Sequence, residues 1–246
     1  LAPEAFRAWL ARAAAAAPLW NPLPLVLDNL HKRYLVELRQ RGVATVPTLL
    51  VERHQRLSLE EAADGFGVDR LVVKPAIGAG SLDTERFQRG DDVRFASHVE
   101  RLAQRGEVLV QPFVESVQDY GERSLVWIDG ELSHAIRKTP RFAGDAERTD
   151  GPLPIADDEA VLARAALAPL VERYGDDLLY ARVDMARSDR GDPMIMELEL
   201  IEPSLFFARR PGSAERFVAA LQREGHRVAM VGDGINDSAA LAQADL

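Results

Sequence analysis

The chain has 246 residues, of which 47% are apolar and 28% are charged, and this balance is ordinary for a globular protein with a buried core. A formal net charge of −9 at pH 7 argues against nucleic acid or an anionic membrane surface as the main partner. The sequence has no cysteine, which excludes disulfides and thiolate chemistry, and no apolar run of about 20 residues that would cross a membrane. The expected location is therefore the cytoplasm.

Helical and strand patterns alternate irregularly along the chain. The expected helices cover residues 3–17, 29–41, 58–67, 91–105, 157–174 and 213–224. The expected strands cover residues 46–51, 71–74, 108–111, 125–128, 131–135, 180–186 and 194–201. Ser58 and Glu61 have capping-box spacing, Asp129-Gly130 predicts a hairpin turn, and Pro169 predicts a kink or a split in its helix. Hairpins and helices without steady strand–helix–strand alternation predict an α+β fold.

Four polar features follow one another in a fixed order. They are Lys32 after a loop; Lys74 at a strand end, followed by the glycine loop with Gly78, Gly80 and Ser81; the strand-end segment Gln111, Pro112, Phe113 and Val114, followed by Glu122; and the carboxylates Asp184, Glu197 and Glu199 on two expected strands. Lysines and closely approaching glycine backbone suit triphosphate, and two or three carboxylates suffice for Mg²⁺, which keeps some phosphate and water ligands.

The carboxylates can be interpreted in two ways, as a metal site or as the polar face of a strand. Glu197 and Glu199 lie two residues apart on a strand and point to the same face, so Asp184 on a neighbouring strand would allow all three to converge. Each feature alone also has an ordinary explanation, because a glycine loop can be a simple turn, a strand-end lysine can be solvated, and two glutamates can be the polar face of a strand. The order and joint presence of the features favour a nucleotide site.

Residues 20–207 resemble the ATP-grasp superfamily, especially its glutathione-synthetase-like and cycloserine-synthetase-like ligases. The resemblance is carried by five ordered stretches, Asn29 to Pro47, Val72 to Ser81, Gln111 to Val114, Gly121 to His134 and Leu179 to Pro203. It implies two α+β subdomains with the nucleotide between them over residues 20–217, preceded over residues 1–19 by the helical remnant of a domain that is otherwise missing.

The resemblance also implies roles for individual residues. Lys32 and Lys74 would contact ATP phosphates or the adenine edge, residues 111–114 would form the adenine hinge, and Glu122 would lie on the ribose side. Asp184, Glu197 and Glu199 would hold Mg²⁺, with Mn²⁺ as an alternative, and Arg182 would stabilise the transferred phosphoryl group. The family pattern usually has asparagine where this chain has Glu199. The roles of Arg137, Lys138 and Arg148 are left open, because residues 137–154 match the pattern poorly.

The last part of the chain has a different character. Residues 227–245 resemble the hinge motif of heavy-metal P-type ATPases, in which Asp233 and Asp237 would help to hold Mg²⁺. The phosphorylation loop and membrane helices of such pumps are not found in this sequence. Residues 218–246 are therefore expected to be a chimeric tail, and both ends of the chain look cut.

The preferred function is an ATP- and Mg²⁺-dependent ligase that joins a small-molecule carboxylate to an amine, or to a thiol, through an acyl phosphate. Positioning and charge neutralisation would carry the catalysis, and no protein nucleophile is needed. The alternatives are an ATP-binding module that has lost ligase activity with its acceptor domain, and a fragment of a metal-transporting P-type ATPase.

Overall fold

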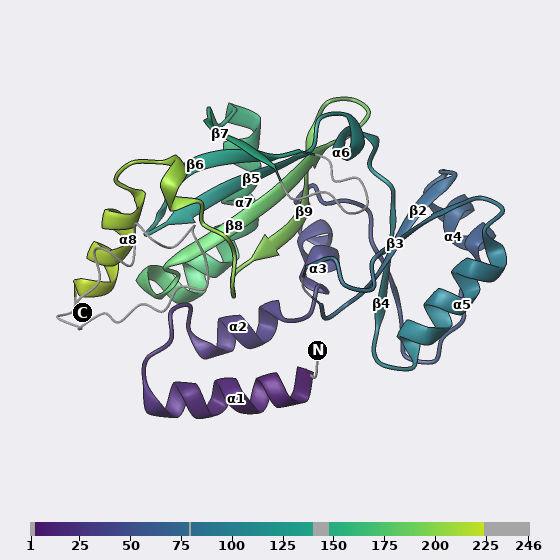
Figure 1. The fold of residues 1–246 in the computed structure, drawn as a ribbon, viewed down its shortest axis with the longest axis horizontal. Helices are drawn as coiled ribbons and strands as arrows, with labels where there is room; N and C mark the ends of the chain where they lie inside the picture. Colours follow the sequence, from purple (N-terminus) through teal and green to yellow (C-terminus); the bar gives the residue numbers. More distant parts are fainter. Residues whose placement is uncertain (1–2, 79, 140–147, 224–246) are drawn as a thin grey trace.

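The computed structural model describes residues 3–78, 80–139 and 148–223, and it confirms the α+β class. Two antiparallel sheets lie side by side, with strand orders β7-β6-β5-β8-β9 and β1-β4-β2-β3 (Figure 1). The strands are β1 (Leu49–Val51), β2 (Arg70–Pro75), β3 (Glu85–Gln88), β4 (Val108–Pro112), β5 (Glu122–Ile128), β6 (Glu131–Lys138), β7 (Thr149–Leu153), β8 (Tyr180–Arg187) and β9 (Pro193–Glu199). The helices are α1 (Pro3–Ala16), α2 (Leu23–Asn29), α3 (Tyr34–Gln40), α4 (Leu59–Phe66), α5 (Asp92–Ala103), α6 (Glu115–Asp119), α7 (Asp157–Tyr174) and α8 (Ser213–Gln222), with 3₁₀ turns at Gly175–Asp177 and Phe207–Arg209.

The smaller sheet buries one face against α4 and α5 (Figure 1). Along β2, Leu71 and Val73 point into this core, so Arg70, Val72 and Lys74 point to the opposite face. The capping box of α4 forms as expected, and Gly67 ends the helix in the left-handed conformation with a φ of 69°. The smaller sheet therefore presents Lys74 on the face that α4 and α5 leave free.

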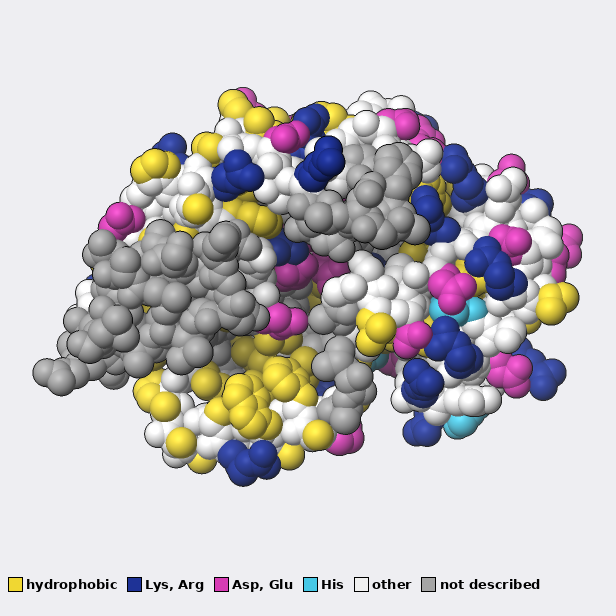
Figure 2. All heavy atoms as spheres, viewed as in Figure 1, with side chains coloured by type: hydrophobic (Ala, Val, Ile, Leu, Met, Phe, Trp, Pro, Cys, Tyr) yellow, Lys and Arg dark blue, Asp and Glu magenta, His cyan; other side chains and the backbone are white. Residues whose placement is uncertain are grey.

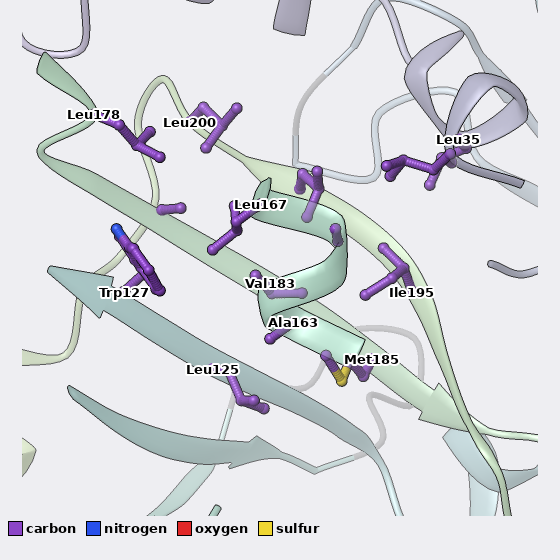
Figure 3. Close-up of a cluster of buried hydrophobic side chains, with 14 of the residues drawn as sticks. Leu35, Leu125, Trp127, Ala163, Leu167, Leu178, Val183, Met185, Ile195 and Leu200 are labelled. Carbon is purple, nitrogen blue, oxygen red and sulfur yellow. The ribbon is translucent and has the colours of Figure 1, made fainter. Parts of the chain in front are cut away.

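Helix α7 packs against one face of the larger sheet. Leu125, Val183 and Met185 point toward Ala163 and Leu167 of this helix (Figure 3). The other face packs against α8 and the segment before it, through residues that include Val126, Ile128, Phe206, Phe207 and Phe217. The expected hairpin is confirmed, since Asp129 and Gly130 both have positive φ, 52° and 81°, as a two-residue turn of this type requires.

Helix α7 continues through Pro169, so the expected split does not occur. Proline removes the backbone bond to the carbonyl four residues earlier, which here belongs to Ala165. Ala165 is exposed, so water can hydrogen-bond that carbonyl, while buried Ala163, Ala166 and Leu167 hold the helix to the sheet. Packing on one side and hydration on the other keep the helix in one piece.

The region around Lys32 differs from the expected helix over residues 29–41. A short helix, α2, ends at Asn29 and α3 begins only at Tyr34, so Lys32 lies in the turn between them. The Asn29 side chain binds the end of β9 instead of facing solvent on a longer helix. Its amide donates to the Leu198 carbonyl at 3.0 Å, and its oxygen accepts from the Leu200 N–H at 3.2 Å. The Tyr34 hydroxyl also accepts from the Leu198 N–H at 3.1 Å, so both helices are fastened to the outer edge of β9.

Several smaller elements depart from the sequence expectations. The first strand begins at Leu49 instead of residue 46, and β3, α6 and β7 were not predicted. The expected boundary between residues 217 and 218 falls inside α8, and residues 227–245, with their ATPase-like motif, lie outside the described residues. No helix in the described ranges is long and apolar enough to cross a bilayer.

Candidate functional site

The carboxylates expected to bind a metal meet on neighbouring strands. In the register of β8 and β9, Asp184 pairs with Glu197 and Arg182 pairs with Glu199. Arg182 and Asp184 lie on the face of β8 opposite to Val183 and Met185, which face α7. Figure 2 shows acidic and basic side chains together in a hollow near the middle of the molecule. The strand register thus gathers the charged residues on one face of the larger sheet.

Asp184 is the centre of the ion-pair network. The residue is 3% exposed, and its carboxylate accepts from Arg182 Nε at 2.9 Å, from Arg182 Nη2 at 2.9 Å and from Lys138 Nζ at 2.7 Å. Burial alone would raise the pKa of Asp184, but Arg182 and Lys138 outweigh it and hold the pKa well below its usual range. Conversely, Asp184 raises the pKa of both cations against the opposing effect of burial. All three groups are therefore charged at neutral pH.

Lys138, whose role the sequence left open, thereby enters the site. It also forms an ion pair with Glu122, at 3.0 Å between Nζ and Oε2, and Glu122 pairs with Lys138 in the register of β5 and β6. Its neighbour Arg137 points elsewhere, with its guanidinium paired to exposed Asp150 and stacked on Tyr120. Arg148 contributes its backbone carbonyl to Thr139, at 2.9 Å from the amide nitrogen. Of these three residues, only Lys138 reaches the carboxylates.

Asp184 and Glu197 place negative charge near Glu199, and the contact of Glu199 with Arg182 does not offset all of it. Burial and the neighbouring charge of Asp184 raise the pKa of Glu199 to about 7. A divalent cation would relieve this imbalance, and three carboxylates supply the hard oxygen donors that Mg²⁺ prefers. Within the described ranges, no three acidic or histidine side chains are grouped as a metal cage, and Arg182, Lys138 and Lys32 contact the carboxylates. The donor chemistry fits the metal, with cations now in contact with the oxygens.

Lys32 connects the two sheets. Its Nζ donates to the Gly78 carbonyl at 2.7 Å and pairs with Glu197 Oε1 at 2.8 Å, and the residue is only 8% exposed. Gly78 belongs to the glycine loop that follows β2, whereas Glu197 belongs to β9 of the larger sheet. A single ammonium group therefore holds the glycine loop next to the carboxylates.

Lys74 is the cation without a close partner. It is half-buried on β2, and its Nζ makes no hydrogen bond or ion pair with any residue in the described ranges. Burial lowers the pKa of Lys74, while the charge of Glu197 opposes this effect and that of Lys32 adds to it. A sheltered ammonium without a partner is suited to an anionic ligand. The sequence contains three lysines, and all three lie at this site.

The glycine loop and the hinge segment frame the site on the side of the smaller sheet. Gly80 and Ser81 adopt left-handed backbone, with φ values of 62° and 59°. Gln111 is buried and donates to Thr48 Oγ1 at 2.8 Å, and the ring of Phe113 is covered by the guanidinium of Arg70 at 5.1 Å. Pro112 is the last residue of β4, and Val114 directly precedes α6. The side chains of Gln111 and Phe113 are thus engaged by the protein itself.

Comparison with known proteins identifies relatives of this chain. No family model matches the chain. Cycloserine biosynthesis protein DcsG from Streptomyces lavendulae is 37% identical over 229 residues, covering 88% of this chain and 76% of DcsG. The crystal structure of D-cycloserine synthetase DcsG superposes with a TM-score of 0.78 at 36% identity, over 89% of this chain and 77% of that chain.

More distant similarities concern the fold or short stretches. A D-alanine–D-alanine ligase from Bacillus anthracis has a TM-score of 0.60 at 20% identity, with 79% of this chain and 66% of the ligase covered, which shows a shared fold. A stretch of 37 residues is 62% identical to a probable copper-transporting ATPase, PacS, from Synechocystis, and covers 15% of this chain and 5% of the pump.

The similarity to DcsG extends over most of both proteins, whereas the similarity to the pump is confined to a short piece. The solved structures that share the fold include the ATP-grasp ligase PsnB, in complex with Mg and ADP, at a TM-score of 0.57 and 20% identity, over 83% of this chain and 62% of PsnB. On this evidence the chain belongs to the ATP-grasp ligase family, as a relative of DcsG, and is an enzyme of that family.

Proposed function

We propose that this enzyme is an ATP- and Mg²⁺-dependent ligase that activates a carboxylate as an acyl phosphate and joins it to an amine. The observation that best supports this is the double contact of Lys32 with Gly78 and Glu197, which brings a phosphate-type loop and a carboxylate set into one hollow. A carboxylate–thiol ligase would use the same first step. The proposal rests on site geometry together with the family of the chain.

The proposed reaction has two steps. In the first, an oxygen of the substrate carboxylate attacks the γ-phosphorus of ATP, the bond between this phosphorus and the β–γ bridging oxygen breaks, and ADP leaves. In the second, the amine nitrogen attacks the acyl carbon, inorganic phosphate leaves, and the amine loses one proton. Arg182 and Lys138 lie beside Asp184 and would neutralise charge that develops on the transferred group.

In this proposal the nucleotide lies between the two sheets. Lys32, Lys74, Gly78, Gly80 and Ser81 bind the phosphates, the backbone of residues 111–114 binds adenine, and Glu122 lies on the ribose side. Asp184, Glu197 and Glu199 would hold Mg²⁺, which supplies charge neutralisation for the phosphates. The partnerless ammonium of Lys74 supports its part in this assignment, and so does the raised pKa of Glu199 for the metal set.

The relatives point to a substrate class. One is described as a D-cycloserine synthetase and another as a D-alanine–D-alanine ligase, so both names involve small amino acids or their derivatives. We propose that the activated carboxylate here also belongs to an amino acid or a close derivative. The amine can then belong to a second molecule, or to the same molecule if the product is a ring.

The test is to incubate the purified chain with ATP, Mg²⁺ and a panel of D- and L-amino acids in the presence of hydroxylamine. An acyl phosphate reacts with hydroxylamine to give a hydroxamate, and we expect equal amounts of ADP and hydroxamate for at least one acid. ATP binding without either product for the whole panel would favour the alternative of a nucleotide-binding module without ligase activity. Reactions without amino acid provide the background.

Glu197→Gln tests the carboxylate set within the same assay. Removing one charged ligand from a preorganised site should lower hydroxamate formation by about 10²-fold or more, while ADP still binds in the absence of Mg²⁺. Glu131→Gln is the matched control, because Glu131 is an exposed glutamate of β6 paired with Arg216. Wild-type turnover in Glu197→Gln would show that the carboxylates are only the polar face of a strand.

A separate proposal concerns the C-terminal residues. We infer that the matches of 40 and 37 residues to copper ATPases include residues 227–245, where the ATPase-like motif lies, and that residues 218–246 are an appended piece. The enzyme proposed here is therefore residues 20–217 together with the rest of α8.

A further inference from the structure

Glu107 lies just before β4 and carries two partners that flank Lys32 in the sequence. Its Oε2 accepts from His31 Nε2 at 2.6 Å, and its Oε1 accepts from Arg33 Nη2 at 2.5 Å. His31 and Arg33 belong to the turn between α2 and α3, whereas Glu107 immediately precedes β4 of the smaller sheet. One carboxylate therefore holds the turn on both sides of Lys32.

The protonation of His31 follows from its second hydrogen bond. The Arg33 N–H donates to His31 Nδ1 at 3.1 Å, so Nδ1 is the acceptor and Nε2 carries the proton that is donated to Glu107. Both contacts of Glu107 are thus made to donors. A glutamine at this position offers one acceptor oxygen and one donor group, so it can satisfy only one of the two partners.

Two backbone hydrogen bonds run parallel to these side-chain contacts. The Lys32 N–H donates to the Ala76 carbonyl at 2.9 Å, and the Ala76 N–H donates to the Glu107 carbonyl at 2.9 Å. The Lys32 ammonium leaves this anchored turn and reaches Gly78 and Glu197. The position of that ammonium is therefore fixed from the turn outward, with Glu107 as the side chain that both flanking residues share.

We propose that Glu107 is a positioning residue that, through His31 and Arg33, sets the Lys32 ammonium where it binds a nucleotide phosphate. This inference rests on the proposed function for the role of Lys32, while the tether itself stands on the contacts above. The side chains of His31 and Glu107 are 22% and 23% exposed and that of Arg33 is 52% exposed, so the ion pairs contribute little to global stability. The effect of Glu107 should appear in ligand binding and not in the unfolding transition.

The first measurement is the affinity for Mg·ADP by calorimetry. Glu107→Gln should weaken binding by about tenfold, the low end of the loss seen when the support of a binding residue is removed, while adenosine binding and the urea midpoint stay as in the wild type. Lys32→Met should weaken Mg·ADP binding directly. In the Lys32→Met background, Glu107→Gln should add no further loss, because the two residues act through one contact.

The second measurement needs no nucleotide. The three lysines, Lys32, Lys74 and Lys138, can be followed separately by mass spectrometry during reductive methylation with formaldehyde and borohydride. Glu107→Gln should raise the methylation rate of Lys32 severalfold, since the Lys32 side chain is only 10% exposed when the tether is intact. The rate at Lys138, which is held by Asp184 and Glu122, should stay unchanged and provides an internal reference.

Glu85→Gln is the matched control for both measurements. Glu85 also lies on the smaller sheet and also contacts a histidine and an arginine, His98 at 2.8 Å and Arg94 at 3.5 Å, but it faces α5. An unchanged Lys32 methylation rate in Glu107→Gln would overturn the tether, as would losses in Glu107→Gln and Lys32→Met that simply add. A wild-type chain that fails to bind Mg·ADP would refute the proposed function, and the methylation result would still decide the tether.

Discussion

Apart from Lys74, the charged side chains of the site within the described ranges are held in ion pairs. Asp184 is shared by Arg182 and Lys138, Glu197 is held by Lys32, and Glu199 is held by Arg182. Removing one partner from such a set leaves the others with an uncompensated charge, and this costs more than the net contribution of the pair. The same pairing explains why a site with several buried ions is compatible with a stable sheet. It also means that ligand phosphates and metal must compete with contacts that already exist.

His134 provides a residue-scale prediction about pH. It is 3% exposed on β6, its Nε2 lies 3.1 Å from the Leu205 carbonyl, and burial lowers its pKa to about 4 from an ordinary value near 6.5. Between these two values the unfolded chain binds a proton that the folded chain does not. The free energy of unfolding should therefore fall as the pH falls from 6.5 to 4, by about 1.4 kcal/mol per pH unit from this group.

Urea unfolding at several pH values measures this effect. Burial also lowers the pKa of His31 and His98, so the wild-type slope contains their contributions as well. The difference between the wild type and His134→Gln isolates the residue, and that variant should show a shallower loss of stability in acid. Exposed His54, changed to Asn, is the control and should retain the wild-type slope. Parallel profiles for the wild type and His134→Gln would contradict the assignment.

At the scale of elements, a buried ion pair joins β5 to α7. Arg123 and Glu159 are 5% and 3% exposed and make two contacts, Nε to Oε1 at 3.0 Å and Nη2 to Oε2 at 2.9 Å. Arg123→Met would leave buried Glu159 with its longer ion pair to Arg187, at 3.4 Å between Oε1 and Nη2. We expect the free energy of unfolding to drop by about 3 kcal/mol in urea titrations.

A second substitution separates charge from packing in this pair. Adding Glu159→Gln to Arg123→Met removes the uncompensated charge and should restore much of the stability. Arg173→Met is the matched control, because the pair of Arg173 with Asp28 is exposed and should change stability by less than about 0.5 kcal/mol. A double variant that is less stable than Arg123→Met would show that the charge of Glu159 is not the source of the loss.

The β5–β6 hairpin shows how far sequence reasoning extends. Asp129-Gly130 predicts the turn, and simple pairing outward from it would place Arg137 opposite Glu122. A bulge near Ser133 shifts the register by one residue between Val126 and Trp127, so Lys138 lies opposite Glu122 instead. The extra residue moves Arg137 to the other face. The sequence has no signal that locates such a bulge, so sequence reasoning alone could not bring Lys138 to Glu122 and Asp184.

Other differences have the same non-local origin. The start of α3 could not be predicted because Asn29 and Tyr34 bond to β9, about 170 residues later in the chain. The α+β class and the capped helix α4 were predictable because they depend on local patterns. Glu107 carried no local signal, since its partners lie 74 and 76 positions earlier. Local chemistry identifies candidate residues, and only the tertiary fold says which of them meet.

At the scale of the whole molecule, two chain lengths test what residues 218–246 contribute. Truncation after Arg223 removes the ATPase-like motif and should leave the urea midpoint and ADP affinity unchanged. Truncation after Phe217 also removes Val218 and Leu221 of α8, which pack into the core on this face of the larger sheet. It should lower the free energy of unfolding by about 2–4 kcal/mol, as expected for two apolar side chains. Equal stability of the two products would contradict the packing of α8, and loss of folding after Arg223 would refute the appended-piece proposal.

The hydrogen bonds that fasten α2 and α3 to β9 also affect the tendency of the molecule to aggregate. An unpaired outer strand is a template on which the strand of another molecule can add. Here the Asn29 side chain imitates a neighbouring strand by donating to Leu198 and accepting from Leu200, and the Tyr34 hydroxyl occupies the Leu198 N–H. Asn29→Ala would free the Leu200 N–H along the strand that carries Glu197 and Glu199. We expect the Asn29→Ala variant to form aggregates as well as to lose activity.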